Sequence, residues 1–270
     1  MAKVRLDVLI VERGLAESRS LAQRLIMAGQ VRVNGQMALK PAALVEEDAQ
    51  ISLEQPPRFV SRGGEKLEAA LRAFQLDVNG LICADVGAST GGFCDCLLQN
   101  GARRVYAIDV GKGILHWKLR QDPRVIVMEA TNARYVERLP EAIDLATIDA
   151  SFISLRVLLP VVRNWFAAKP VAPSPAFPAV VALVKPQFEA GRAQVARGQG
   201  VIRDPQLHRQ VLREVLEFAV RHGYVVRGLI RSPLLGPKGN VEFLTWMTLT
   251  EPDDHTPPDV DDLITQAQSS

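Results

Sequence analysis

The chain has 270 residues, of which 47% are hydrophobic and 23% are charged, a composition typical of a soluble globular protein with room for two domains of unequal size. It contains no run of 18 apolar residues, and its first residues lack the apolar core of a secretory signal, so a membrane-spanning or secreted protein is disfavoured. The net charge of +2 conceals an asymmetry: six of the 30 acidic residues lie in 251–270, which has no Lys or Arg, leaving 32 basic against 24 acidic residues elsewhere. A basic body is compatible with binding to nucleic acid.

The three cysteines form no disulfide framework. Cys94 and Cys96 have no histidine nearby, so they do not make a four-ligand metal site. We therefore expect a cytoplasmic protein that contains no metal, does not bind membranes and is a monomer.

The first 55 residues form a compact unit. Apolar residues at helical spacing predict helices over 5–13 and 19–28. Residues 31–36 alternate in polarity and contain the Asn34-Gly35 turn signal, and a further short strand spans 51–53. The pattern predicts a small α+β domain.

Motifs in this unit match a known RNA-binding module. Arg5-Leu-Asp, Ser18-Arg-Ser-Leu-Ala-Gln-Arg24 and Val33-Asn-Gly35 occur in the order found in the S4 domain, which they resemble. That resemblance implies a basic face that docks on structured RNA, where contacts to phosphates supply much of the affinity. A basic run is otherwise most often a solvated face. The candidate RNA-binding residues here are Arg5, Arg19, Arg24 and Arg32.

A basic, proline- and glycine-containing junction follows. We expect a linker over 56–66, which contains two more candidate RNA-binding residues, Arg58 and Arg62. The domain after it spans 67–250, and the acidic tail 251–270 is predicted to be disordered.

From Leu81 onward, strand patterns alternate with helix patterns. Such alternation predicts an α/β fold with a mostly parallel, Rossmann-like sheet that binds ligands at the carboxyl ends of its strands. The expected helices lie near 93–100, 153–164 and 206–222. The expected strands are 81–86, 104–109, 125–129, 145–149, 179–184, 225–230 and 242–249.

A glycine loop follows the first of these strands, in Asp85-Val-Gly-Ala-Ser-Thr-Gly-Gly-Phe93. It matches neither the dehydrogenase fingerprint nor the phosphate-binding Walker motif, since no lysine follows the glycines. A nucleoside cofactor without a phosphate clamp, such as S-adenosylmethionine, fits better, although such a turn can also be purely structural. The candidate cofactor-binding residues are Asp85, Gly87, Ser89, Gly91, Gly92 and Phe93.

Acidic and amide side chains end the next two strands. Asp109 is placed to accept both hydroxyls of a ribose. Glu129 and Asn132 follow the third strand, where we expect an adenine.

Charged residues also stand at the ends of apolar strands, where burial is costly unless the charges are paired. Asp149, Lys185 and Glu242 do so, and Lys66 lies in the junction. In order and context these four resemble the Lys-Asp-Lys-Glu tetrad of the FtsJ-like ribose 2′-O-methyltransferases. With the S4-like unit, the chain resembles the TlyA family of rRNA methyltransferases, also labelled haemolysin A.

The resemblance implies methyl transfer from S-adenosylmethionine to a cytidine 2′-OH of ribosomal RNA, with ribosomal subunits as partners. Lys185 would activate the hydroxyl, and Lys66, Asp149 and Glu242 would hold the ribose and Lys185 in register. Arg192, in a basic glycine-containing loop, is a further candidate RNA contact. The alternatives are a non-catalytic RNA-binding or ribosome-assembly protein and a membrane-lytic haemolysin.

Overall fold

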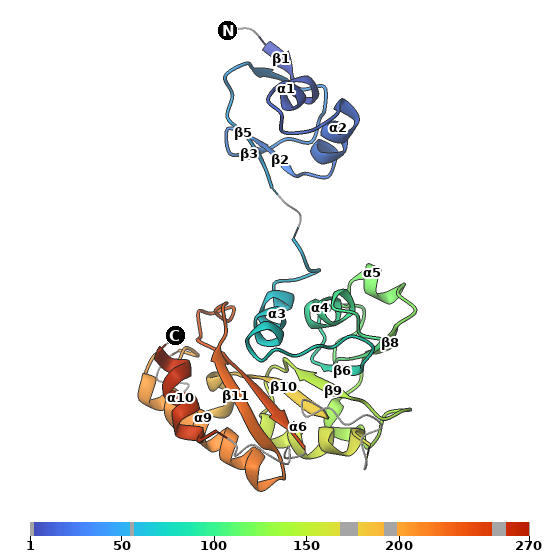
Figure 1. Ribbon diagram of the computed structural model, residues 1–270. Helices are drawn as coiled ribbons and strands as arrows, with labels where there is room; N and C mark the ends of the chain where they lie inside the picture. The colour runs from blue at the N-terminus through green and yellow to red at the C-terminus, as the bar shows by residue number, and fades with distance from the viewer. Residues whose placement is uncertain (1–2, 55–56, 168–177, 192–198, 250–257, 270) are drawn as a thin grey trace. The chain divides into compact units, whose positions relative to one another are not determined.

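The chain forms two compact units, an N-terminal unit over Met1–Arg58 and a C-terminal unit over Phe59–Ser270 (Figure 1). No helix in the parts of the chain that the structure describes is long and apolar enough to cross a membrane. The computed structural model describes residues 3–54, 57–167, 178–191, 199–249 and 258–269.

The N-terminal unit packs two helices against short strands. Helix α1 (Leu6–Glu12) begins one residue later than predicted because β1 (Lys3–Arg5) pairs with β4 (Leu44–Glu46), a pairing that the sequence pattern did not reveal. Helix α2 (Arg19–Met27) has the predicted N-cap, since the Ser18 hydroxyl accepts the Leu21 N–H at 3.2 Å. The second sheet has the order β3-β2-β5, made of Gln36–Met37, Val31–Val33 and Ile51–Leu53.

The C-terminal unit is built on a seven-stranded sheet with the order β11-β12-β10-β9-β6-β7-β8. Strand β12 is antiparallel to both of its neighbours, and the pairs among β10, β9, β6, β7 and β8 are parallel. This arrangement confirms the predicted α/β, Rossmann-like fold. The strands are β6 (Ile82–Val86), β7 (Arg104–Ile108), β8 (Val125–Met128), β9 (Leu145–Ile148), β10 (Ala179–Val184), β11 (Val225–Arg231) and β12 (Phe243–Thr248).

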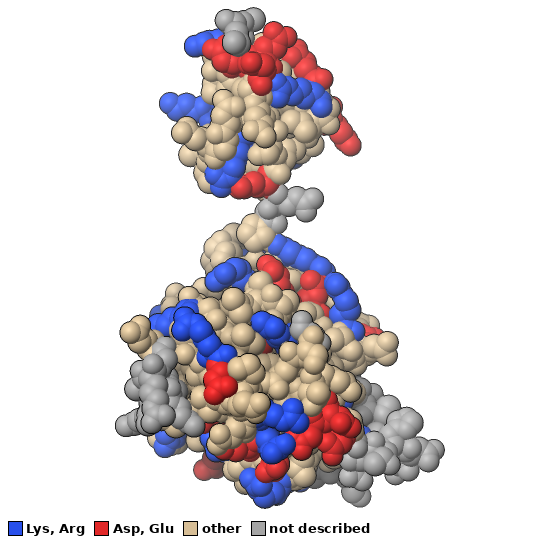
Figure 2. Space-filling view, turned by 90° about the vertical axis from the view of Figure 1, so that its left-hand side faces the viewer, with Lys and Arg blue, Asp and Glu red and all other residues tan. Residues whose placement is uncertain are grey.

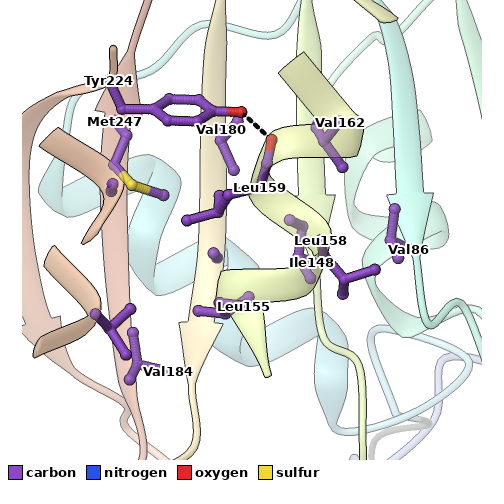
Figure 3. Packing of buried hydrophobic residues seen from close by; sticks show 14 of the residues in the cluster. Val86, Ile148, Leu155, Leu158, Leu159, Val162, Val180, Val184, Tyr224 and Met247 are labelled. Carbon is purple, nitrogen blue, oxygen red and sulfur yellow. Dashed lines mark hydrogen bonds between the residues drawn. The ribbon is translucent and has the colours of Figure 1, made fainter. Parts of the chain in front are cut away.

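Helices cover both faces of this sheet. Because successive residues of a strand point to opposite faces, Cys83 packs in the cluster under α3 (Gly63–Ala73) and α4 (Gly92–Gln99). Its neighbour Ala84 faces the cluster formed with α6 (Leu155–Val162) and α9 (Pro205–Arg221). Figure 3 shows that second cluster, in which the Tyr224 hydroxyl donates to the Leu159 carbonyl at 2.8 Å. The two cores hold the strand ends in fixed positions.

Helix α10 (Val260–Ser269) corrects the expectation of a disordered tail. It packs on α9 and β11 and buries Leu263, Ile264 and Ala267. Asp261 forms ion pairs with Arg209 and Arg213 of α9. Some of the acidic residues of 251–270 therefore belong to the polar face of an amphipathic helix that packs on the rest of the unit.

The predicted linker is also shorter than expected, because α3 begins at Gly63. The glycines here permit close packing. A Cβ on Gly64 would lie 2.2 Å from the ring of the buried Phe59, and one on Gly92 would lie 2.8 Å from the Gly64 nitrogen. Shorter helical elements are α5 (Trp117–Arg120), α7 (Pro186–Glu189), η1 (Ala133–Tyr135) and η2 (Arg163–Trp165).

Candidate active site

The strand order creates a crevice between β6 and β9. The chain runs from β6 outward to β7 and β8, then returns to the other side of β6 as β9, which is the point where doubly wound folds bind ligands. Gly87 follows β6 and Asp149 follows β9. Gly87 has φ 83°, and a Cβ there would lie 2.7 Å from the Asp149 carbonyl oxygen. Only glycine lets the two strand ends approach this closely.

A cavity of about 340 Å³ opens at this crevice. The glycine loop forms one wall, and the beginning of α3 and the loop that contains Leu234 and Leu235 form others. Lys66 and Asp149, two members of the predicted tetrad, line the same space. The full lining is Ser61, Arg62, Gly63, Lys66, Gly87, Ala88, Ser89, Thr90, Gly92, Phe93, Asp149, Leu234, Leu235 and Pro237.

The glycine loop keeps its shape through unusual backbone angles. Ser89 and Gly91 have φ 51° and 99°, both in the left-handed region. Gly91 directly precedes α4, and a Cβ there would lie 2.1 Å from a methyl group of Leu119. Four of the predicted cofactor-binding residues line the cavity: Gly87, Ser89, Gly92 and Phe93. Glycine at position 91 is required by the positive φ of the turn and by the contact with Leu119.

Asp85 does not reach the cavity, which corrects the prediction that it contacts a cofactor. Its side chain is completely buried and accepts hydrogen bonds from the Cys94 N–H and thiol, both at 3.0 Å, and from the Thr147 hydroxyl, also at 3.0 Å. Burial raises the pKa of Asp85 to about 7. The residue ties the end of β6 to the start of α4 and to β9.

Asp109 supports the glycine loop directly. One carboxylate oxygen accepts the Ser89 N–H at 2.8 Å, and the other accepts the Gly111 N–H at 2.7 Å. Carboxylate oxygens can accept more than one hydrogen bond. Asp109 therefore retains capacity for ribose hydroxyls beside Val110, whose side chain is exposed.

Glu129 and Asn132, predicted near the adenine, have hydrogen-bond partners within the protein. Glu129 accepts the N–H groups of Gly113 at 2.8 Å and Ile114 at 3.1 Å and pairs with Arg120. The Arg120 guanidinium and the N–H groups of Gly113 and Leu115 lower the pKa of Glu129 to about 2. The Asn132 side chain accepts the Arg134 N–H at 3.2 Å and begins η1. Both residues shape loops around the site.

The four predicted tetrad residues form two ion pairs. Lys185 Nζ lies 2.6 Å from Asp149 Oδ1, and Lys66 Nζ lies 2.6 Å from Glu242 Oε2. The antiparallel register that pairs Val184 with Phe243 places Lys185 beside Glu242 on the neighbouring strand. The side chains of Lys185 and Glu242 are 9% and 1% exposed, and their partners Asp149 and Lys66 are 21% and 12% exposed, so each pair joins a buried charge to a partly exposed one.

Two polar residues that the sequence interpretation missed complete the set. The Ser151 hydroxyl lies 3.1 Å from Lys185 Nζ, and the Gln187 amide nitrogen donates to Glu242 Oε1 at 3.3 Å. Both stand within two residues of a tetrad member, in Asp149-Ala-Ser151 and Lys185-Pro-Gln187. That proximity in sequence is the signal that could have identified them.

Phe152 was also missed. Its side chain is 90% exposed, and its backbone has φ 64°, which is rare and unfavourable for a bulky residue. The ring packs on Phe188, with 4.9 Å between the centroids. An exposed aromatic ring next to the tetrad offers a flat surface for a nucleobase.

The predicted RNA-binding arginines have different surroundings. Arg5 and Arg19 each form an ion pair at 3.0 Å with the buried Asp7, and Arg32 pairs with Glu54 at 2.5 Å. Arg24, Arg58 and Arg62 are exposed, and Arg192 lies outside the described residues. In Figure 2 basic and acidic side chains are interspersed in both units. Carboxylates therefore hold Arg5, Arg19 and Arg32 in place. The side displayed in Figure 2 has no continuous basic face among the described residues.

A doubly wound sheet with an antiparallel β12 inserted beside β10, a glycine loop after β6 and two lysine–carboxylate pairs at the strand ends defines a Rossmann-like methyltransferase. The comparisons agree. The family model for FtsJ-like methyltransferases matches residues 59–249, and the S4 domain matches residues 4–51.

Relatives match over nearly the whole chain. YqxC of Bacillus subtilis is 50% identical over 249 residues, which are 90% of this chain and 84% of that protein. The Mycobacterium tuberculosis protein named 16S/23S rRNA (cytidine-2′-O)-methyltransferase TlyA is 45% identical, over 91% of this chain and 90% of its own. A solved structure named "Putative hemolysin from Streptococcus thermophilus" has a TM-score of 0.70 and is 44% identical in sequence. The match covers 100% of this chain and 97% of that one. The chain belongs to the TlyA family, in which an S4 domain precedes an FtsJ-like methyltransferase domain.

Proposed function

We propose that this protein transfers a methyl group from S-adenosylmethionine to a cytidine ribose 2′-OH of ribosomal RNA. The observation that carries the proposal is the shared cavity: the glycine loop and the tetrad residues Lys66 and Asp149 line the same space of about 340 Å³. A donor on the loop and an acceptor at the tetrad would therefore meet without a large movement of either.

The residues around the glycine loop fit S-adenosylmethionine. The lining from Gly87 to Thr90 offers backbone polar groups without a lysine that would clamp a phosphate. Asp109 would hold the ribose hydroxyls, and the exposed Val110 would contact the adenine. When bound, this cofactor supplies a methyl group on a sulfonium centre, which an oxygen nucleophile can accept.

The tetrad prepares the acceptor hydroxyl. Lys185 Nζ would take the proton of the ribose 2′-OH after losing its own, while Asp149 orients the amine at 2.6 Å. The Ser151 hydroxyl can donate or accept, so it satisfies Lys185 in either protonation state. Lys66, fixed by Glu242, would place a positive charge in the cavity beside the oxygen as that oxygen becomes negative.

Two features support RNA as the acceptor. The N-terminal unit matches the S4 domain, and the M. tuberculosis relative is named for cytidine 2′-O-methylation of 16S and 23S rRNA. Phe152 would stack on the acceptor base.

The experiment that tests the proposal is incorporation of tritiated methyl from S-adenosylmethionine into purified ribosomal subunits, followed by mapping of the modified nucleotide. We expect stoichiometric methylation at a cytidine ribose. Modification of a base rather than a ribose would contradict the assigned chemistry. RNA binding without measurable affinity for the cofactor would instead favour a non-catalytic assembly protein.

A further inference from the structure

The strands that carry Asp149 and Lys185 separate before they reach these residues. The β9–β10 ladder runs from Leu145 paired with Ala179 to Ile148 paired with Ala182. Lys185 lies three residues beyond the last pair. The β10–β12 ladder holds Val184, the residue before Lys185. The path of the chain beyond Val184, and the position of the lysine amine relative to Asp149, depend on further contacts.

Side chains connect the two segments past this point. Lys185 contacts Asp149 at 2.6 Å and Ser151 at 3.1 Å. The rings of Phe152 and Phe188 follow, 4.9 Å apart. These contacts link residues 149–152, after β9, to residues 185–188, after β10.

The last connection is made by Glu189. One of its carboxylate oxygens accepts the Ser154 hydroxyl at 2.5 Å, and the other accepts the Leu155 N–H at 2.7 Å, at the N-terminus of α6. Glu189 is only 6% exposed, and burial raises its pKa. The Arg156 guanidinium, 3.7 Å from the carboxylate, also donates to the Glu189 carbonyl at 2.8 Å. A carboxylate buried this deeply needs such partners, so its removal would release the segment that it holds.

We propose that Glu189 is a positioning residue that sets the place of Lys185 by anchoring α7 to the start of α6. Helix α7 is a single turn, with Lys185 immediately before it and Glu189 at its end. Fixing its far end fixes the direction in which the chain leaves β10, and hence where the lysine amine lies. The catalytic role of Lys185 in this inference rests on the proposed function. The claim that Glu189 sets the position of Lys185 does not.

The test compares three variants of the full-length protein. Glu189→Ala removes the anchor, and Glu189→Gln keeps an oxygen that can accept the Leu155 N–H. The matched control is Glu141→Ala, which removes a carboxylate that accepts the Tyr106 hydroxyl at 2.9 Å and pairs with Arg104, near the amino end of β9. The position of Lys185 is read from its rate of acetylation by acetic anhydride, measured by mass spectrometry, without RNA or cofactor.

We expect Glu189→Ala to raise the acetylation rate of Lys185 about tenfold, because local opening would expose the amine. The value of kcat would fall about 100-fold, as small displacements of catalytic groups do, while the dissociation constant of the cofactor stays within about twofold. Glu189→Gln should retain most of the activity, and Glu141→Ala should leave Lys185 as protected as in the parent.

An unchanged acetylation rate in Glu189→Ala would overturn the inference, whatever the activity. So would an equal increase in Glu141→Ala, because that result would reflect general loosening of the fold. If the parent protein methylates no ribosomal RNA, the proposed function fails, but the acetylation comparison still decides whether Glu189 positions Lys185.

Discussion

The two units place buried carboxylates in opposite arrangements. In the N-terminal unit, the side chain of Asp7 is completely buried, yet its partners Arg5 and Arg19 remain 42% and 53% exposed. In the C-terminal unit, Glu242 and its partner Lys66 are 1% and 12% exposed. Asp7 pairs with arginines that remain exposed to solvent. Glu242 pairs with a lysine that is itself mostly buried.

The difference follows from the cations. A guanidinium has five N–H donors in a fixed plane, so Arg5 can use two of them on Asp7 and present others to a phosphate. A lysine ammonium is a compact charge whose contacts are set by one nitrogen. The comparison teaches that Asp7 in the N-terminal unit presents partly exposed cations to solvent, whereas Glu242 at the site of the C-terminal unit encloses its lysine partner.

The largest expected effect comes from removing a confined charge. Lys185→Met should reduce methyl transfer about 1,000-fold, because general-base catalysis typically contributes factors of this size. Cofactor affinity should be unchanged, since the Lys185 amine contacts Asp149 and Ser151 rather than the glycine loop. Single-turnover methylation and calorimetric titration measure the two quantities.

The control for this change is Lys118→Met, which breaks another lysine–carboxylate pair, with Asp95 at 3.1 Å. Its activity should match the parent. Retained activity in Lys185→Met would contradict the mechanism.

Asp7→Asn removes the acid that displays charge. The Arg5 guanidinium, together with Gln23 and Arg19, holds the pKa of Asp7 well below its usual range. The stabilisation is therefore complete above about pH 4, the usual Asp pKa, and is lost as the pH falls through the lower value of the folded state. Hydrogen exchange of α1 and α2 amides should show a loss of about 2 kcal/mol at pH 6 in Asp7→Asn, the size expected for hydrogen bonds to a charged group.

The same exchange measurement contains its own check. Protection in the parent should fall between pH 6 and pH 3, and the Asp7→Asn protein should show a smaller fall. Glu17→Gln, at an exposed position of the same unit, should behave like the parent. Equal pH dependence in the parent and Asp7→Asn would show that Asp7 is not the anchor.

Glu129→Gln tests a carboxylate that shapes a loop beside the cavity. Losing the ionised partner of Arg120 and of the Gly113 N–H should loosen residues 111–115. The dissociation constant of S-adenosylmethionine should rise about tenfold, since binding must then order the loop. Equilibrium titration measures the constant. An equal loss in kcat at saturating cofactor would assign Glu129 to the chemistry instead.

The smallest expected effect concerns an exposed arginine. Arg24→Ala should weaken RNA binding by less than about tenfold and reduce the slope of log affinity against log salt concentration by about 1. Arg13, whose guanidinium donates to the Ala49 carbonyl at 2.6 Å, is the comparison residue. Filter binding over a range of salt concentrations should give Arg13→Ala the same slope as the parent protein. If the slope of log affinity against log salt concentration in Arg24→Ala equals that of the parent protein, Arg24 does not contact a phosphate.

The sequence predicted those parts of the molecule whose signals are local. Apolar runs located the strands, glycine spacing located the loop after β6, and the family resemblance singled out four residues that the structure joins in two ion pairs. The partners of Glu189 could not be predicted, because Ser154 lies 35 residues earlier and no periodicity links them. The contact between Asp7 and Arg19, 12 residues later, could not be predicted for the same reason. The helix α10 was missed because its acidic residues outweighed three buried apolar ones.

The place of β12 in the sheet has a consequence for the biogenesis of the enzyme. It follows all the other strands of the described residues, yet it lies inside the sheet between β10 and β11. A nascent chain that ends before Glu242 has β10 and β11 without the strand that joins them, and lacks the partner of Lys66. Translation must therefore pass Thr248 before the sheet can close and Lys66 can pair with Glu242.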